Sequence, residues 1–397
     1  MNKKKKVLLA FSGGLDTSYC AIHLAIDKGY EVWTIAVNTG GFDKGEQEEL
    51  AIKAADLGIK HHVCIDVEEE FYQKGIKYLI AGNVLKNHTY PLSVSAERVF
   101  QAIAIAEYAK EIGADAIAHG STGAGNDQVR FDLVFNVLAP EMEIITPIRD
   151  QKLSREEEVE YLKSHGINKE WAKAKYSINQ GLWGTSVGGA ETLTSNKYLP
   201  EEAWPTKLVN RDSLTVEIEF ENGEPVGING EKLGPVSTIK RLTEIAAPFG
   251  IGRDIHVGDT IIGIKGRVGF EAAAPLIIIE AHRLLEKHIL GRWQLYWKDQ
   301  LGEFYGMLMH EGQFLDPVMR DIETFLENTQ GKVTGKVFVK LEAKRFELQG
   351  IESKYDLMAS KFGQYGEMNQ GWSGEDVKGF TKILSNATLI QRGIQDD

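Results

Sequence analysis

Residues 12–18 read Ser-Gly-Gly-Leu-Asp-Thr-Ser, which places two adjacent glycines among three hydroxyls and one acid, directly after a short apolar run. The apolar run at 7–11 predicts a strand buried on both faces, and residues 16–28 predict a helix. A turn from strand to helix presents free backbone N–H groups, which together with the helix dipole favour an anion. Because the two glycines put no Cβ in the way of phosphate oxygens, we predict a phosphate-binding loop.

This loop differs from two common nucleotide-binding patterns. It lacks the lysine and the length of the GxxxxGK[ST] loop, and it does not match the GxGxxG dinucleotide pattern. An ordinary strand-to-helix turn would also need glycine, but it would not need the additional hydroxyls or Asp16. A carboxylate repels phosphate unless a cation lies between them, so Asp16 predicts that Mg²⁺ accompanies the phosphates.

A second polar stretch, residues 119–131, reads His-Gly-Ser-Thr-Gly-Ala-Gly-Asn-Asp-Gln-Val-Arg-Phe. Its glycines, its threonine and its Asn-Asp pair form a loop that can bind carboxylate and amino groups together. Arg130, one turn into the next predicted helix, offers two parallel N–H donors to a carboxylate. Taken singly, Asn126 could instead be a helix cap and Arg130 a surface charge.

Strand and helix patterns alternate over the first 150 residues, and this alternation must position both loops. The predicted strands lie at 7–11, 32–38, 61–67, 114–119 and 143–148, and the clearest helices at 16–28, 46–58 and 95–113. Such alternation predicts an α/β fold with a doubly wound parallel sheet. Ligands of these sheets bind at the carboxyl ends of the strands, where both polar loops are expected.

The pattern changes from about residue 170. We predict antiparallel hairpins at 214–228 and 332–350, a strand at 259–264 and a long apolar helix at 272–290, with two aromatic-rich helices after it. This mixture is typical of a separate α+β domain. Beyond a glycine-rich stretch, a final helix carries apolar residues at helical spacing (Val377, Phe380, Leu384 and Ala387). Such a face packs either on a neighbouring subunit or on its own domain.

Composition narrows the class of protein. The 397 residues carry a formal net charge of −12, which argues against nucleic acid or an anionic membrane surface as the main partner. Two cysteines cannot form a disulfide framework, and no apolar stretch is long enough to span a membrane, so we expect a soluble, cytoplasmic protein. His61, His62 and Cys64 fall short of a complete metal site.

The 12–18 loop resembles the pyrophosphatase-type loop of ATP-using adenylating enzymes. Most of the chain resembles the argininosuccinate synthase family, on residues 119–131 and on the matching stretches at 90–95, 176–177, 182–186 and 250–253. The resemblance implies that citrulline, aspartate and ATP give argininosuccinate, AMP and pyrophosphate in arginine biosynthesis, with Mg²⁺ on the ATP phosphates. It also implies a homotetramer.

The resemblance further implies a division of the chain and a role for each matched residue. A nucleotide-binding domain would span 1–168, a catalytic and multimerisation α+β domain 169–362, and an oligomerisation segment 363–397. Asp16 and Asp127 would be catalytic, and no residue is assigned as a direct metal ligand. ATP would contact Ala10, Phe11, Ser12, Gly13, Gly14, Leu15, Asp16, Thr17, Ser18, Val37 and Gly120. Aspartate would contact Thr122, Asn126 and Asp127, and citrulline would contact Tyr90, Ser95, Asn126, Arg130, Ser177 and Ser186.

The chain departs from the family pattern at three positions. Ala124 stands where the family loop usually has lysine, and Gly258 and Phe270 stand where a glutamate and a tyrosine hold citrulline. Asp259 is the adjacent acid that we expect could replace that glutamate.

Two rival functions stay open at this point. A tRNA-thiolating enzyme would need sulfur-carrying cysteines and a basic surface. A non-catalytic ATP-binding module would not need the second polar loop.

Overall fold

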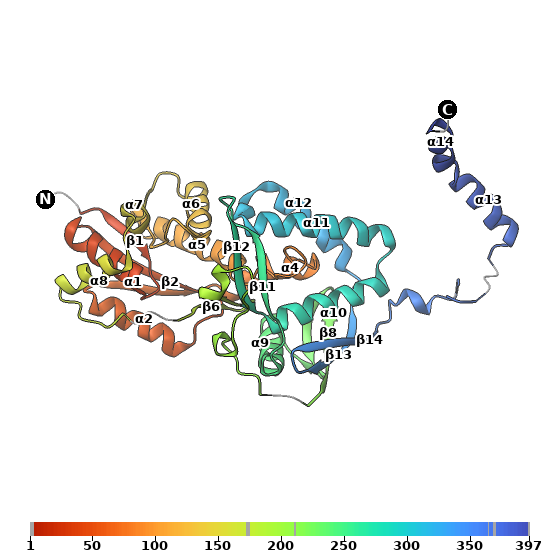
Figure 1. The fold of residues 1–397 in the computed structure, drawn as a ribbon, viewed down its shortest axis with the longest axis horizontal. Coiled ribbons are helices and arrows are strands. Elements are labelled where there is room, and N and C mark those ends of the chain that lie inside the picture. The colour runs from red at the N-terminus through yellow and green to blue at the C-terminus, as the bar shows by residue number, and fades with distance from the viewer. Residues whose placement is uncertain (1–3, 172–174, 210–211, 364, 368–370, 396–397) are drawn as a thin grey trace.

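A computed structural model describes residues 4–171, 175–209, 212–363, 365–367 and 371–395. Its first part is a five-stranded sheet in which every pair of neighbours is parallel (Figure 1). The strands lie in the order β3 (His61–Asp66), β2 (Glu31–Asn38), β1 (Lys6–Ala10), β4 (Ala116–Ala118) and β5 (Glu143–Ile145). The predicted α/β parallel sheet is therefore confirmed. The strand order reverses between β1 and β4, and the carboxyl ends of these two strands flank the point where such sheets bind ligands.

Alternate residues of β1 pack against helices on opposite faces of the sheet. Leu8 belongs to the hydrophobic cluster that contains α5 residues, whereas Val7 and Leu9 belong to the cluster that contains α1 residues. All three side chains are fully buried, as a central strand with two covered faces requires. The helices of this part are α1 (Leu15–Ile22), α2 (Lys44–Asp56), α3 (Glu68–Phe71), α4 (Lys77–Ala81), α5 (Ser93–Glu111), α6 (Asp127–Leu138), α7 (Pro147–Gln151) and α8 (Arg155–Ser164), with π-helical turns at His23–Asp27 and Tyr72–Ile76.

The second part contains two antiparallel sheets. One has the order β10 (Glu231–Lys232), β9 (Glu224–Ile228), β8 (Leu214–Glu221), β13 (Gly335–Glu342) and β14 (Arg345–Glu352), which confirms both predicted hairpins. The other has the order β11 (Arg253–Asp259), β12 (Lys265–Glu271), β7 (Gly184–Gly188) and β6 (Ser177–Gly181). The helices here are α9 (Pro235–Ala246), α10 (Ala273–Ile289), α11 (Arg292–His310) and α12 (Pro317–Gln330), with short 3₁₀ turns at Ala190–Leu193, Glu201–Ala203, Ala247–Phe249, Gln313–Leu315 and Leu357–Ala359.

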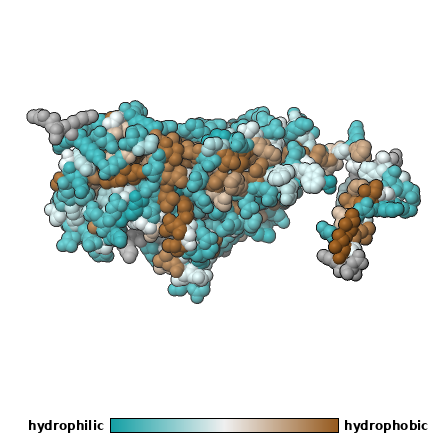
Figure 2. Space-filling model, turned by 90° about the horizontal axis from the view of Figure 1, so that it is seen from above, coloured by the Kyte–Doolittle hydropathy of each residue, from teal (hydrophilic) through white to brown (hydrophobic). Residues whose placement is uncertain are grey.

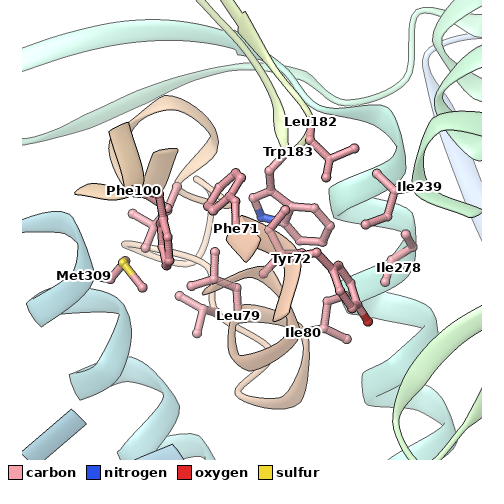
Figure 3. Close-up of a cluster of buried hydrophobic side chains, with 14 of the residues drawn as sticks. Phe71, Tyr72, Leu79, Ile80, Phe100, Leu182, Trp183, Ile239, Ile278 and Met309 are labelled. Atoms are coloured by element: carbon pink, nitrogen blue, oxygen red, sulfur yellow. The ribbon is translucent and has the colours of Figure 1, made fainter. Parts of the chain in front are cut away.

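One hydrophobic core runs from the first part of the chain into the second. Figure 3 shows side chains of the 71–80 segment beside Trp183, Ile239 and Ile278. The Trp183 indole is fully buried and donates a hydrogen bond to the Pro91 carbonyl oxygen at 2.9 Å. This shared core fixes β6 and β7 against α5, and so brings two distant stretches of sequence to the same site.

The predicted strand at 259–264 is wrong. Strand β11 ends at Asp259, and residues 260–264 form the turn that leads into β12. The turn is closed by a hydrogen bond from the Thr260 N–H to the Ile264 carbonyl oxygen, and Gly263 takes a positive φ of 83°. The β-branched isoleucines of this segment suggested a strand, but Ile262 and Ile264 are exposed and do not pack in a sheet.

Two further boundaries differ from the sequence prediction. The strand predicted at 143–148 ends at Ile145, because Pro147 begins α7. The single C-terminal helix is two helices, α13 (Gly374–Leu384) and α14 (Asn386–Gln395).

The two C-terminal helices stand apart from the rest of the molecule (Figure 1), and hydrophobic side chains gather on them (Figure 2). Phe380, Ile383 and Leu384 on α13 are 63–71% exposed, and Leu389 and Ile390 on α14 are 61% and 63% exposed. Among the described residues, no helix combines the length and the apolar content that crossing a membrane demands.

Candidate active site

The loop after β1 has the geometry expected for an anion site. Gly13 has a φ of 68°, which favours glycine, and a Cβ added there would lie 2.8 Å from the Lys53 Cδ, so that side chain would have to shift. Gly14 is the extended N-cap of α1, which leaves the first backbone N–H groups of that helix without helical partners. The Ser12 and Thr17 hydroxyl oxygens lie 3.3 Å apart. Backbone and hydroxyl donors therefore converge at this helix end.

The loop after β4 touches the loop after β1. A Cβ on Gly120 would lie 3.3 Å from both the Asp16 carbonyl carbon and the Thr17 Cγ2. His119, which is 1% exposed, anchors this second loop: its Nδ1 accepts from the Ser121 N–H at 3.3 Å. Its Nε2 lies 2.9 Å from an Asp132 carboxylate oxygen. The ends of β1 and β4, together with Val37 at the end of β2, thus form one continuous edge of the sheet.

A second carboxylate faces Asp16. Glu158 on α8 is 3% exposed, and burial together with the neighbouring Asp16 raises the pKa of its carboxyl to about 7. Its Oε2 is fully enclosed, and a hydrogen bond that the protonated carboxyl shares with Asp16 raises the pKa further. Glu158 was not predicted from the sequence, because it lies in an acidic helix start, Glu156–Glu158, that is typical of a solvated surface.

The Asp127 carboxylate lies between two guanidinium groups. Arg98 Nε donates to Asp127 Oδ2 at 3.1 Å, and an Arg130 terminal nitrogen donates to Oδ1 at 3.0 Å. Arg130 Nε also donates to the His310 carbonyl oxygen at 3.0 Å. Desolvation opposes ionisation of Asp127, but the two arginines lower the pKa of its carboxyl below the usual value. The structure therefore joins the predicted residues Asp127 and Arg130 directly.

Arg98 was not predicted from the sequence, although it holds this cluster together. Besides Asp127, its terminal nitrogens donate to Glu97 Oε1 and Gln101 Oε1, both at 2.9 Å, and to Asn179 Oδ1 at 3.1 Å. Asn179 lies on β6, so Arg98 connects α5, α6 and the second part of the chain. The available signal was an adjacent acid and base in the mostly apolar stretch 96–106.

Tyr90 and Ser95 also meet. The phenol oxygen of Tyr90 accepts from the Val94 N–H at 3.2 Å and from the Ser95 hydroxyl at 3.3 Å, and it keeps a proton to donate. Both residues are 4% exposed. The Tyr90 ring stacks on His256, with ring centroids 5.1 Å apart, and lies 5.3 Å from the Phe270 ring.

Strand register places the two predicted serines on one sheet face. Ser186 on β7 pairs with Asn179 on β6 and with Phe270 on β12, so these side chains share a face. Ser177 is two residues from Asn179 and lies on that face, although it is exposed. On this face of the sheet, Phe270 contacts the Tyr90 ring, and Asn179 accepts a hydrogen bond from Arg98.

The remaining predicted residues of the second loop are less enclosed. Asn126 is the N-cap residue of α6, but its side-chain oxygen accepts from the Ile261 N–H at 2.9 Å instead of capping the helix. It therefore ties this loop to the β11–β12 turn. Thr122 and Ala124 are exposed. The aliphatic part of Arg149 lies beside Gly123, and its guanidinium is paired with Asp132 at 2.7 Å.

Asp259 does not take the place that we expected for it. It is 64% exposed in its side chain and forms an ion pair with Lys265 at 2.7 Å. Along β11, Asp259 points away from the face that carries His256 and Gly258. A Cβ on Gly258 would lie 2.6 Å from the His256 Nε2, so the imidazole already fills the space beside that glycine.

The described part of the chain contains no group of three or more His, Cys, Asp or Glu side chains that could hold a metal ion. His62, near Cys64 on β3, instead lies with its Nδ1 3.0 Å from the Thr34 hydroxyl oxygen. The site therefore combines backbone that suits an anion on one side with paired, partly buried charged side chains on the other. Such a site can hold a nucleotide and a zwitterionic ligand close together.

A parallel 3-2-1-4-5 sheet with a glycine loop at its switch point defines a nucleotide-binding α/β protein. Residues 6–168 match the model of the arginosuccinate synthase N-terminal HUP domain, and residues 176–390 match the model of the arginosuccinate synthase C-terminal domain. The chain belongs to the argininosuccinate synthase family.

Curated relatives agree with these matches. The argininosuccinate synthase of Methanocaldococcus jannaschii is 41% identical over 364 residues, which is 91% of each chain. That of Methanococcus maripaludis is 40% identical over 99% of each chain, and that of Dictyoglomus thermophilum is 38% identical over the full length of both.

Proposed function

We propose that this chain is a carbon–nitrogen ligase that condenses citrulline with aspartate at the expense of ATP, giving argininosuccinate, AMP and pyrophosphate in arginine biosynthesis. The observation that carries the proposal is the contact between two loops at the sheet's switch point: a phosphate loop at 12–18 and a loop leading to the Asp127–Arg130 pair. Family membership supports this function over a tRNA-thiolating enzyme or a non-catalytic ATP-binding module.

On the nucleotide side, ATP would lie along the carboxyl ends of β2, β1 and β4, against Ala10 to Ser18, Val37 and Gly120. The free N–H groups of α1 and the hydroxyls of Ser12 and Thr17 suit the phosphates. Carboxylate oxygens suit Mg²⁺, and the close approach of the Glu158 and Asp16 carboxyls, which raises the pKa of Glu158, fits a cation nearby. Asp16 would hold this Mg²⁺ together with phosphates and water, and the ion would offset phosphate charge.

On the amino-acid side, Thr122, Asn126 and Asp127 would hold aspartate, with the Asp127 carboxylate accepting from its amino group. Tyr90, Ser95, Asn126, Arg130, Ser177 and Ser186 would hold citrulline. Arg130 is 4% exposed, and a carboxylate that reached it would form a strong charge-assisted hydrogen bond.

The reaction would proceed in two displacements. A ureido oxygen is a poor leaving group, so it must first be converted into a better one. The citrulline ureido oxygen would attack the α-phosphorus of ATP, forming an O–P bond and releasing pyrophosphate. The aspartate nitrogen would then attack the ureido carbon, lose a proton and expel AMP. No side chain of the chain forms a covalent bond in this scheme, so rate would come from positioning and charge neutralisation.

The exposed apolar faces of α13 and α14 support a homo-oligomer, which we propose is a tetramer in the cytoplasm. The domain limits proposed are 1–168, 169–362 and 363–397, and the last segment would provide the subunit contacts. Light scattering of the Phe380→Asp, Leu384→Asp double variant tests this assignment: a smaller assembly is expected. An unchanged assembly would exclude α13 from the interface.

A direct test of the reaction is separation of the products formed from ATP with citrulline, aspartate or both. The proposal expects AMP and pyrophosphate in equal amounts with argininosuccinate, and no nucleotide cleavage without citrulline. ADP as the main product would exclude this function.

A further inference from the structure

A buried acid next to the amino-acid end of the site has no role in the scheme above. Glu97 on α5 is 1% exposed. Its Oε1 accepts from Arg98 at 2.9 Å, and its Oε2 accepts from the Thr39 hydroxyl at 3.1 Å. Burial of a carboxylate is costly unless its oxygens are paired in this way. Glu97 is therefore held on both sides, and Arg98 is one of the groups that hold it.

The surrounding backbone is shaped to accommodate this carboxylate. A Cβ on Gly181, at the end of β6, would overlap Glu97 Oε2. The Leu182 N–H donates to the Thr39 carbonyl oxygen at 3.0 Å, which fixes the β6–β7 turn against the loop after β2. The Glu97 carboxylate thus lies where the ATP edge of the sheet and the second part of the chain meet.

Four charged groups form a chain in space: Glu97, Arg98, Asp127 and Arg130. Consecutive members are hydrogen-bonded at 2.9, 3.1 and 3.0 Å, so acids and bases alternate and the formal charges cancel. If Glu97 were removed, Arg98 and Arg130 would share one carboxylate, and the cluster would carry an excess positive charge. An excess positive charge repels an incoming ammonium group.

We propose that Glu97 is a positioning residue for the amino-acid step: through Arg98, it sets the direction and the charge balance of the Asp127 carboxylate that receives aspartate. This inference rests on the proposed function, in which Asp127 meets the aspartate amino group. It predicts that changes at Glu97 affect aspartate and leave ATP cleavage largely unaffected.

The protonation of Glu97 gives the inference an independent readout. Desolvation raises the pKa of its carboxyl to about 7, although Arg98 and Thr39 act in the opposite direction. The charged groups near it are Arg98 on its own helix and Asp127 on α6; Thr39 and Gly181 face it without charge. As pH falls through 7, Glu97 becomes neutral. The aspartate KM of the unaltered enzyme should therefore rise toward the value of a Glu97→Gln variant.

The experiment compares the full-length enzyme with Glu97→Gln, Glu97→Ala and the control Glu107→Gln. Glu107 lies on the exposed side of the same helix. Gln keeps the size and one acceptor oxygen and, like protonated Glu97, is uncharged and offers a donor in place of the other oxygen. We therefore expect an aspartate KM about three-fold higher for Gln, and about ten-fold higher for Ala, at pH about 8. The KM for ATP and citrulline-dependent isotope exchange in ATP should stay within about two-fold of the unaltered enzyme. Glu107→Gln should change none of these values.

The outcomes separate the two proposals. If the unaltered enzyme makes no argininosuccinate, the proposed function fails, whatever the variants do. If it is active but Glu97→Gln has an unchanged aspartate KM and an unchanged pH profile, the inference is wrong. Equal losses for all three substrates would also overturn it, because they would indicate a purely structural role. If Glu97→Ala does not fold, Glu97→Gln alone decides.

Discussion

The nucleotide loop and the charged cluster around Asp127 lie at the same edge of one sheet, but they are built in different ways. The loop takes its donors from seven consecutive residues and mostly from backbone, because a strand end and a helix start supply them locally. The cluster takes side chains from α5, α6 and β6, which are joined through Arg98, and the two arginines in it are largely buried. The conformation of the nucleotide loop is therefore set mainly by adjacent residues, whereas the geometry of the charged cluster depends on how the two parts of the chain pack.

The largest effect is expected in the cluster, from Asp127→Ala. This change leaves Arg98 and Arg130 without their shared acid and removes the proposed acceptor for the aspartate amino group. We expect argininosuccinate synthesis to fall by about 100-fold or more. The Arg98 and Arg130 side chains are only 14% and 5% exposed, so the loss of their shared acid should also lower the free energy of unfolding, by about 1–3 kcal/mol.

Steady-state rates and thermal unfolding measure the two effects separately. Asp321→Ala, at an exposed position on α12, is the matched control and should change neither. A variant at position 127 that keeps more than half of its activity would contradict the assignment of this carboxylate.

On the nucleotide side, Asp16→Asn should have the next largest effect. The change removes the charge that would hold Mg²⁺ at the phosphate loop. Loss of one charge-stabilising group costs about 2 kcal/mol of transition-state stabilisation, or roughly 30-fold in rate. The measurement is kcat/KM for ATP at limiting Mg²⁺, with Asp56→Asn on the exposed surface of α2 as the control. A rate within about two-fold of the unaltered enzyme would refute the role of Asp16.

Tyr90→Phe removes one oxygen from the amino-acid side of the site and leaves the ring in its stack with His256. The lost oxygen accepts from Ser95 and from the Val94 N–H. We expect the citrulline KM to rise about three- to ten-fold, since one hydrogen bond contributes about 0.5–1.5 kcal/mol. The KM for ATP should hardly change. Tyr108→Phe, farther along α5, serves as the control, and an equal rise in both variants would argue against a specific contact.

The smallest effect is expected from Asp259→Ala. This acid faces away from His256 and Gly258 and is paired with Lys265 at the surface. The citrulline KM should stay within about two-fold, and an exposed ion pair contributes little to stability. A ten-fold rise in the citrulline KM would place Asp259 in the site after all and would require the β11–β12 hairpin to rearrange.

The two regions also differ in what sequence alone could predict. The parallel sheet, the phosphate loop and the loop at 119–131 follow from local patterns, because strand, turn and helix start are set by neighbouring residues. Arg98 and Glu97 were missed because their importance depends on Asn179 and Thr39, which only folding brings near. The isoleucines at 261–264 suggested a strand, but they lie in a turn that a hydrogen bond from the Ile261 N–H to Asn126 holds in place. Asp259 was adjacent in sequence to the expected position, and the two-residue period of a strand put it on the wrong face.

In the proposed mechanism, the phosphate loop activates citrulline and the charged cluster delivers aspartate. Citrulline-dependent positional isotope exchange in ATP, measured in the Asp127→Ala variant beside the unaltered enzyme, separates these two roles. We predict that exchange in the variant stays within a few-fold of the unaltered rate, while argininosuccinate formation falls by about 100-fold or more. Loss of exchange in proportion to the loss of synthesis would contradict this mechanism, because it would show that Asp127 is needed for the first step as well.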